Sequence, residues 1–158
     1  IKIFNDGKDF LGTGGSVKKI VKYLNDDFFV QNGDTFLNID YDCLYRINKK
    51  YNKSLICYSN FKYNKLDFPN MKTKKDKILD YNKDIYKNNN SIDAGLYIFN
   101  KDDFKNIKRK KFDLSLLIYE LINKKKLRGY KISRKFHEIG SFKGLADFER
   151  YVKIKNIK

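Results

Sequence analysis

The spacing of apolar residues changes repeatedly along the chain, and each change predicts a switch between helix and strand. In residues 16–24, apolar side chains recur at the three- and four-residue intervals of one helix face. The short apolar run at residues 28–31 (FFVQ) is typical of a buried strand. Helices are predicted at residues 16–24, 41–51, 102–107, 113–123 and 142–152, and strands at residues 1–5, 28–31, 54–59, 77–81, 95–99, 127–132 and 136–139.

This order of elements predicts an α/β fold in which a mostly parallel sheet is covered by helices on both faces. The chain has 158 residues, of which 41% are hydrophobic, and this is the size of one domain with its own core. We therefore expect residues 1–158 to form a single domain. Ligands of such sheets bind at the carboxyl ends of the strands, so polar segments at strand ends are the candidate sites.

Cysteine, histidine and apolar content narrow the possible functions. Cys43 and Cys57 lie in apolar surroundings without metal-ligand spacing, which indicates a reduced, cytoplasmic protein. His137 is the single histidine, so a histidine-cluster metal site is excluded within this chain. No apolar run is long enough to cross a bilayer, and we expect no membrane partner.

The formal net charge of +16 has two interpretations. One is a partner that is a nucleic acid or another polyanion. The other is an AT-rich coding sequence, since lysine, asparagine, isoleucine and tyrosine are abundant together. The lysines are spread over the whole chain rather than along one stripe, so we favour the second interpretation and expect no nucleic-acid partner.

A glycine-rich segment, residues 11–16 (LGTGGS), directly precedes the first predicted helix. Glycines allow a ligand to approach the backbone closely, and a helix N-terminus offers unpaired N–H groups and the positive end of a dipole. This pattern is typical of phosphate or nucleotide binding. An ordinary turn with Ser16 as the helix cap explains the same residues equally well.

Two acidic residues follow or begin predicted strands far apart in the chain. Asp34 lies in residues 31–35 (QNGDT), just after the strand at 28–31, and Glu138 lies in residues 136–141 (FHEIGS). Carboxylates at such places can hold Mg²⁺ together with phosphate oxygens. The alternatives are a plain Asn-Gly-Asp turn and a solvated Glu138 at the entry to a helix.

In order and spacing these segments resemble the sugar-phosphate nucleotidylyltransferases, whose pattern reads approximately L-G-T-G-G-A, a helix, and F-x-V-x-N-G-D. Residues 93–99 (DAGLYIF) are similar to the N-A-G-I-Y-x-F strand of that family, and residues 136–141 are similar to its W-x-D-I-G-T segment. The resemblance covers essentially the whole chain. The Gly-Thr-Gly-Gly form of the loop looks most like enzymes that activate heptose 1-phosphate with GTP, or mannose 1-phosphate.

The resemblance implies a Rossmann-like nucleotidyltransferase fold, with a mixed, mostly parallel sheet flanked by helices. It also implies an enzyme that joins a sugar 1-phosphate to a nucleoside triphosphate, GTP being favoured, with release of pyrophosphate, for lipopolysaccharide or capsule sugar-nucleotide synthesis, and a possible homo-oligomer. By the same resemblance, Asp34 and Glu138 would bind Mg²⁺, and Asp34 and Lys83 would be catalytic. The nucleotide would contact Gly12, Thr13, Gly14, Gly15, Asn32 and Gly33, and the sugar phosphate would contact Lys83, Asp93 and Gly95.

Several positions depart from the family pattern. Asn82 and Ser115 stand where glutamates are usual, and Glu138 and Asp93 stand where aspartate and asparagine are usual. The family also opens with a strand and a glycine-rich loop containing Arg and Lys that holds the triphosphate, and nothing in this chain matches it. We therefore expect the C-terminal two-thirds of such a domain, without its first βαβ unit.

Three other functions are compatible with parts of the sequence. A non-catalytic nucleotide- or sugar-binding subunit is favoured by the weakened acidic positions. A nucleic-acid-binding domain is suggested by charge alone, because the predicted elements match no known module. A glycosyltransferase that uses a nucleotide-sugar usually has a D-x-D pair, and residues 38–40 (NID) are not one.

Overall fold

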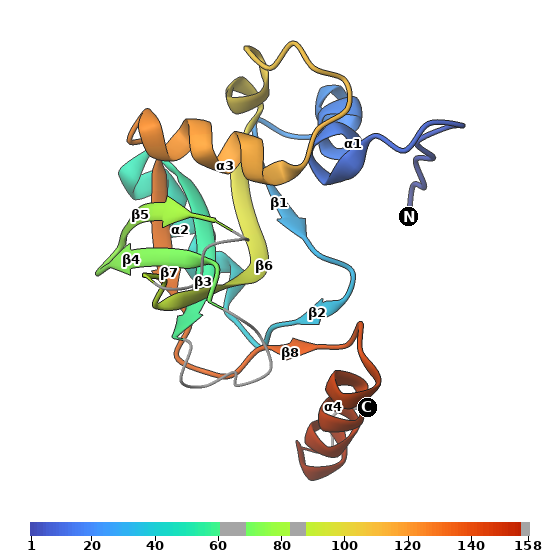
Figure 1. Ribbon diagram of the computed structural model, residues 1–158, viewed down its shortest axis with the longest axis vertical. Helices are drawn as coiled ribbons and strands as arrows, with labels where there is room; N and C mark the ends of the chain where they lie inside the picture. The colour runs from blue at the N-terminus through green and yellow to red at the C-terminus, as the bar shows by residue number, and fades with distance from the viewer. Residues whose placement is uncertain (61–68, 83–87, 156–158) are drawn as a thin grey trace.

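The computed structural model describes residues 1–60, 69–82 and 88–155, which form a mixed α/β structure around one main sheet (Figure 1). No described helix is long and apolar enough to span a membrane. In chain order the elements are α1 (Gly12–Ile20), η1 (Val21–Tyr23), β1 (Asp27–Gln31), β2 (Thr35–Phe36), α2 (Tyr41–Tyr51), β3 (Ser54–Asn60), β4 (Met71–Lys74), β5 (Lys77–Tyr81), β6 (Ser91–Asn100), η3 (Lys101–Phe104), α3 (Leu114–Asn123), β7 (Leu127–Lys131), β8 (His137–Glu138) and α4 (Phe142–Lys155).

The main sheet has six strands in the order β5-β4-β6-β3-β7, and β1 pairs with β6. β1, β3 and β7 run in one direction, since β7 is parallel to β3 and both β1 and β3 are antiparallel to β6. The expected common direction therefore holds for these strands, but the expectation of mostly parallel pairing is wrong. The reason is that β6 lies between β1 and β3, so only the β3–β7 pair is parallel among the described ladders.

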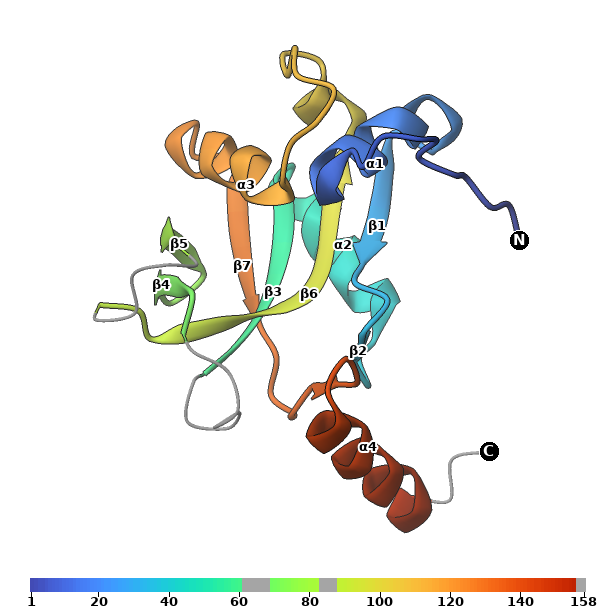
Figure 2. The same cartoon turned by 45° about the vertical axis from the view of Figure 1, so that its right-hand side comes forward.

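Helices cover both faces of the sheet, as predicted, with α1 and α3 on one face and α2 on the other (Figure 2). Alternate residues of β3 point to the two faces. Ile56 and Tyr58 belong to the core cluster beneath α1 and α3, whereas Leu55 and Cys57 belong to the cluster that includes Leu44 of α2. Burial on both faces explains why β3 reads as a continuous apolar run rather than an alternating one.

The helices that match their predicted bounds carry local signals at their ends. Asp40 caps α2 by accepting a hydrogen bond of 2.9 Å from the Cys43 N–H, and Asn52 ends the helix in the left-handed conformation. Asp113 caps α3 in the same way through the Ser115 N–H, at 2.9 Å.

Several local predictions are corrected by the structure. Residues 1–5 form no strand, because no described strand pairs with them, and Ile1 and Ile3 are exposed. The first helix begins at Gly12 instead of Ser16. Residues 102–107 contain part of a short 3₁₀ turn, η3, and β2 and β4 are strands that the pattern did not predict.

A smaller unit lies below the main sheet, where β2 and β8 form a two-stranded ladder and α4 projects away from the core (Figure 1). Among the described residues, neither core cluster includes a residue of α4. The position of α4 is therefore set by its contacts with β8 and β2, and this unit carries both predicted metal-binding carboxylates.

Candidate functional site

The β2–β8 ladder places Asp34 beside Glu138, although about a hundred residues separate them in the chain. Thr35 is paired with Glu138 and Phe36 with His137 in antiparallel register. The Ile139 N–H extends this ladder by donating a hydrogen bond of 2.7 Å to the Asp34 carbonyl oxygen. The backbone at Asp34 is thus fixed directly against the segment that bears Glu138.

The two carboxylates converge over Gly140. A Cβ atom placed on Gly140 would lie 2.6 Å from Glu138 Oε1 and 3.3 Å from Asp34 Oδ2, so both oxygens lie close to one point. The other Glu138 oxygen, Oε2, accepts a hydrogen bond of 2.8 Å from Ser141 Oγ. Ser141 Oγ in turn accepts one of 3.0 Å from the Gly144 N–H at the start of α4. Glu138 is therefore held by one oxygen while the other faces Asp34.

This pair of carboxylates fits a Mg²⁺ ion that shares its coordination with substrate. Mg²⁺ is commonly held by one or two carboxylates, with phosphate oxygens and waters completing its octahedron. The described residues contain no group of three or more histidine, cysteine or acidic side chains that would make an all-protein cage. Asp34 is exposed and Glu138 is half-buried, which leaves room for phosphate oxygens.

A hollow of about 460 Å³ opens next to Asp34. It lies between the start of α1 and the turn after β1, and Leu114 of α3 contributes to its wall. Four of the residues predicted to bind nucleotide line it, namely Gly12, Thr13, Asn32 and Gly33. The structure therefore brings these four together with the Asp34 carboxylate.

Gly14 and Gly15 are placed differently from the other predicted nucleotide-binding residues. Both are buried, and both N–H groups donate to the Phe112 carbonyl oxygen at 3.1 Å. A Cβ on Gly14 would lie 2.3 Å from the Phe112 ring, and one on Gly15 would lie 2.4 Å from the Lys110 carbonyl oxygen. These two glycines allow α1 to pack closely against the chain before α3, and they do not line the hollow.

The Phe112 carbonyl also explains why α1 begins earlier than predicted. The first N–H groups of a helix lack partners within the helix and need a cap. No side chain caps α1, and the backbone of a distant segment does so instead. Thr13 strengthens the same junction, because its Oγ1 accepts a hydrogen bond of 2.9 Å from the Leu114 N–H.

Asp93 and Gly95, predicted to contact the sugar phosphate, lie at a kink in β6 where Gly95 has φ +70°. Asp93 Oδ1 accepts from the Gly95 N–H at 2.9 Å, and Oδ2 accepts from the hydroxyls of Tyr97 at 2.5 Å and Tyr81 at 3.0 Å. Burial, and next the charge of Asp93, raise the pKa of both tyrosines. The carboxylate of Asp93 is therefore engaged by its own chain.

Gly95 also connects this kink to the turn that bears Asp34. Its carbonyl oxygen accepts from the Asn32 N–H at 2.8 Å. A Cβ on Gly95 would approach Asn32 Nδ2 to 2.9 Å and Thr35 Oγ1 to 3.0 Å. Only a glycine permits both the left-handed backbone and this close approach.

Lys83 and Ser115 are two further positions that the family resemblance singles out. Lys83 lies outside the described residues. Ser115, which stands where the family pattern has a glutamate, lies in the first turn of α3, two residues after the capping residue Asp113. Sequence reasoning missed Ser141, although a serine just before the predicted helix at 142–152 is the usual signal of a helix cap.

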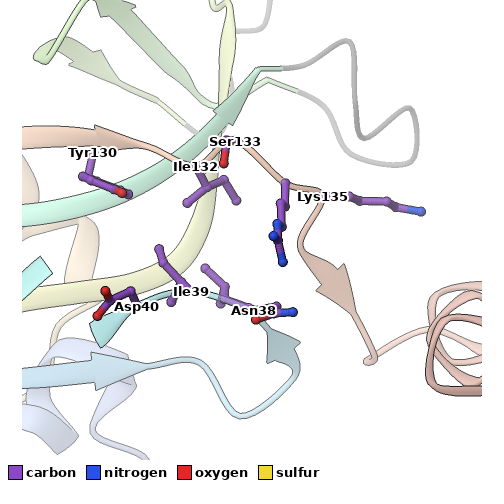
Figure 3. Close-up of a pocket in the computed structure, with 9 residues that line it drawn as sticks. Asn38, Ile39, Asp40, Tyr130, Ile132, Ser133 and Lys135 are labelled. Carbon is purple, nitrogen blue, oxygen red and sulfur yellow. The ribbon is translucent and has the colours of Figure 1, made fainter. Parts of the chain in front are cut away.

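A second hollow, of about 440 Å³, lies between residues 37–40 and residues 130–135 (Figure 3). Tyr130, Ile39 and Asp40 border the space, whereas Lys135 points away from it. None of the predicted site residues that the structure describes lines this hollow, and it opens onto apolar side chains of the cluster beneath α2. The chemistry therefore points to the hollow beside Asp34 as the functional site.

The chain is similar to known proteins in both sequence and fold. No protein-family model matches the sequence. The chain is 31% identical over 138 residues to D-glycero-alpha-D-manno-heptose 1-phosphate guanylyltransferase of Campylobacter jejuni, covering 84% of this chain and 59% of that protein. The chain thus spans less than two-thirds of the length of this relative.

Solved structures show the same fold. The structure of HddC from Yersinia pseudotuberculosis complexed with GMP-PN matches with a TM-score of 0.68 and 20% identity, over 91% of this chain and 64% of that one. UDP-glucose pyrophosphorylase from Acinetobacter baumanii matches with a TM-score of 0.77 and 13% identity, over 96% of this chain and 59% of that one. The predicted α/β fold class is therefore confirmed.

Proposed function

We propose that this chain, which has the fold of the sugar-phosphate nucleotidylyltransferases and a sequence relative among them, carries the metal-binding part of such an enzyme. The reaction joins a sugar 1-phosphate to a nucleoside triphosphate and releases pyrophosphate. The observation that carries the proposal is the convergence of Asp34 Oδ2 and Glu138 Oε1 over Gly140, beside the hollow lined by Gly12, Thr13, Asn32 and Gly33.

The chain's own groups suit a reaction that depends on positioning. An oxygen of the sugar 1-phosphate attacks the α-phosphorus of the nucleotide, and such transfers rely on alignment and charge neutralisation. Mg²⁺ would supply positive charge to the reacting phosphates when bound by Asp34 and Glu138. Ser141 orients Glu138, and we propose that Lys83 neutralises the phosphate of the sugar.

The substrates we propose are GTP and a heptose- or mannose-type sugar 1-phosphate. Support comes from the name of the Campylobacter jejuni relative, which specifies a heptose 1-phosphate and a guanylyl transfer, and from the GMP-PN complex of HddC. The Gly-Thr-Gly-Gly sequence at residues 12–15 points the same way. The product would be a sugar nucleotide for polysaccharide synthesis.

A second candidate function is that of a subunit that binds the substrates without catalysing the reaction. Two observations favour it specifically. Ser115 and Asn82 replace glutamates of the family pattern, and the Asp93 carboxylate accepts hydrogen bonds from two tyrosines of its own chain. A site with these changes can still hold a nucleotide and a sugar phosphate.

Pyrophosphate release separates the two candidates. The complete polypeptide that contains these 158 residues is incubated with Mg²⁺ and pairs of nucleotide and sugar 1-phosphate. We expect release with GTP and the heptose or mannose 1-phosphate, and much slower release with CTP or glucose 1-phosphate. If every pair is inactive while GTP still binds, the transferase proposal fails and the binding subunit replaces it.

A further inference from the structure

His137 is nearly fully buried, although it is the immediate neighbour of Glu138. Its side chain is 6% exposed and lies among the rings of Phe36, Phe148 and Tyr151, with 4.4 Å between the His137 and Tyr151 ring centres. Successive residues of a strand point to opposite faces. His137 therefore faces the aromatic side chains of α4, and Glu138 faces Asp34.

Asp147 of α4 secures this histidine. Asp147 Oδ2 lies 3.0 Å from His137 Nδ1 and also accepts a hydrogen bond of 2.7 Å from Lys135 Nζ. Lys135 and His137 flank Phe136 on the segment that leads into β8. One carboxylate oxygen of α4 thus holds two side chains of the segment that bears Glu138.

The first turn of α4 contacts Glu138 itself. A Cβ on Gly144 would lie 2.1 Å from the Glu138 carbonyl oxygen and 2.6 Å from its Oε2 atom, so the helix lies directly against this residue. Ser141 provides the hydrogen bond to Oε2 at the same place. The orientation of Glu138 therefore depends on where α4 lies.

We propose that Asp147 is a positioning residue for the carboxylate pair, because its contacts with His137 and Lys135 fix α4 against β8 and so aim Glu138 at the cation shared with Asp34. The inference rests on the proposed function, since it assumes that Asp34 and Glu138 bind a divalent cation. Removal of a group that orients a metal ligand without touching the metal typically weakens metal binding by about 10- to 100-fold.

A purely stabilising role for Asp147 predicts something different. Its ion pair with Lys135 is partly exposed, with side-chain exposures of 41% for Lys135 and 29% for Asp147, and ion pairs at the surface contribute about 1 kcal/mol or less to stability. Because the described α4 residues lie outside both core clusters, loss of Asp147 leaves the packing of the main sheet unchanged. The metal affinity should therefore change far more than the global stability.

The test measures Mn²⁺ binding by the loss of the free-ion electron paramagnetic resonance signal. Asp147→Ala is compared with Asp147→Asn, which keeps an acceptor for His137, and with Glu149→Ala, an exposed acidic residue of the same helix. We expect Asp147→Ala to weaken Mn²⁺ binding by about tenfold, and Asp147→Asn to recover most of this loss. Glu149→Ala should match the wild type, and far-ultraviolet circular dichroism should be the same for all variants.

Asp34→Asn, measured in parallel, distinguishes the failure of this inference from the failure of the proposed function. If Asp34→Asn weakens Mn²⁺ binding but Asp147→Ala behaves like Glu149→Ala, the positioning role is wrong and the metal site stands. If Asp34→Asn has no effect, or the wild type binds no Mn²⁺, the metal site itself is wrong and the inference falls with it.

Discussion

Two regions of this protein contain glycines that permit a close approach, but they use that approach in different ways. Gly14 and Gly15 in α1 make room for the backbone and ring of residues 110–112. Gly140 instead makes room for the carboxylates of Asp34 and Glu138, and Gly144 makes room for the backbone and the carboxylate of Glu138. The first region joins two helices, and the second brings two charges together. A glycine-rich segment therefore indicates close approach, but only the structure shows whether the neighbour is the chain itself or a binding group.

The largest expected effect is a loss of activity in the region where the carboxylates of Asp34 and Glu138 meet. Asp34→Asn in the complete polypeptide should lower kcat by at least about a hundredfold, because a lost metal ligand removes several kcal/mol of transition-state stabilisation. Steady-state pyrophosphate release at saturating Mg²⁺ measures it. A variant with a near-normal rate would show that Asp34 is not a ligand.

Substitutions in the region of Gly14 and Gly15 should lower the stability of the protein. Gly15→Ala places a methyl group 2.4 Å from the Lys110 carbonyl oxygen, so the backbone must move. We expect a loss of about 1–3 kcal/mol in the free energy of unfolding, measured by urea denaturation. An unchanged midpoint would mean that the junction of α1 with residues 110–112 is looser than the structure indicates.

Gly140→Ala should separate the two regions most clearly. The added methyl group would lie 2.6 Å from Glu138 Oε1, the flexible end of a side chain that can turn away. We expect Mn²⁺ affinity to fall by about tenfold with little change in stability. Equal losses of affinity and stability would instead make Gly140 a packing residue like Gly15.

The smallest effect is expected at Gly33, where a Cβ would meet nothing within 4 Å. Gly33→Ala should change the free energy of unfolding by no more than about 0.5 kcal/mol, which makes it the matched control for Gly15→Ala. Its KM for the nucleotide should nevertheless rise, since Gly33 lines the hollow beside Asp34. A nucleotide KM equal to that of the wild type would place the ligand elsewhere.

The elements that could be predicted from the sequence are those whose signals are local. α2 matches its predicted bounds because Asp40 and Asn52 mark its two ends. The start of α1 could not be predicted, because its cap is the Phe112 carbonyl, about a hundred residues away. The four residues of β4 (MKTK) likewise carry no strand signal, and pairing with β5 and β6 decides their conformation.

In the candidate site, too, some features could be predicted from the sequence and others could not. Asp34 and Glu138 could be named from the family resemblance, and the β2–β8 ladder brings them together. The engagement of Asp93 by Tyr81 and Tyr97 could not be foreseen, because Tyr81 meets Asp93 only through the pairing of β4, β5 and β6, and Tyr97 meets it within β6 across the kink at Gly95. Ser141 contacts Glu138 directly, whereas we propose that Asp147 acts on it through α4, and nothing in their local sequence identifies either role.

The two-residue ladder between β2 and β8 has a consequence for how the protein reaches its native state. Closing a loop of about a hundred residues for so few contacts is entropically unfavourable, so this ladder should form late, after the transition state for folding. Interactions that form late act on the unfolding rate rather than on the folding rate. A divalent cation bridging Asp34 and Glu138 should accordingly prolong the lifetime of the native state without making it form faster.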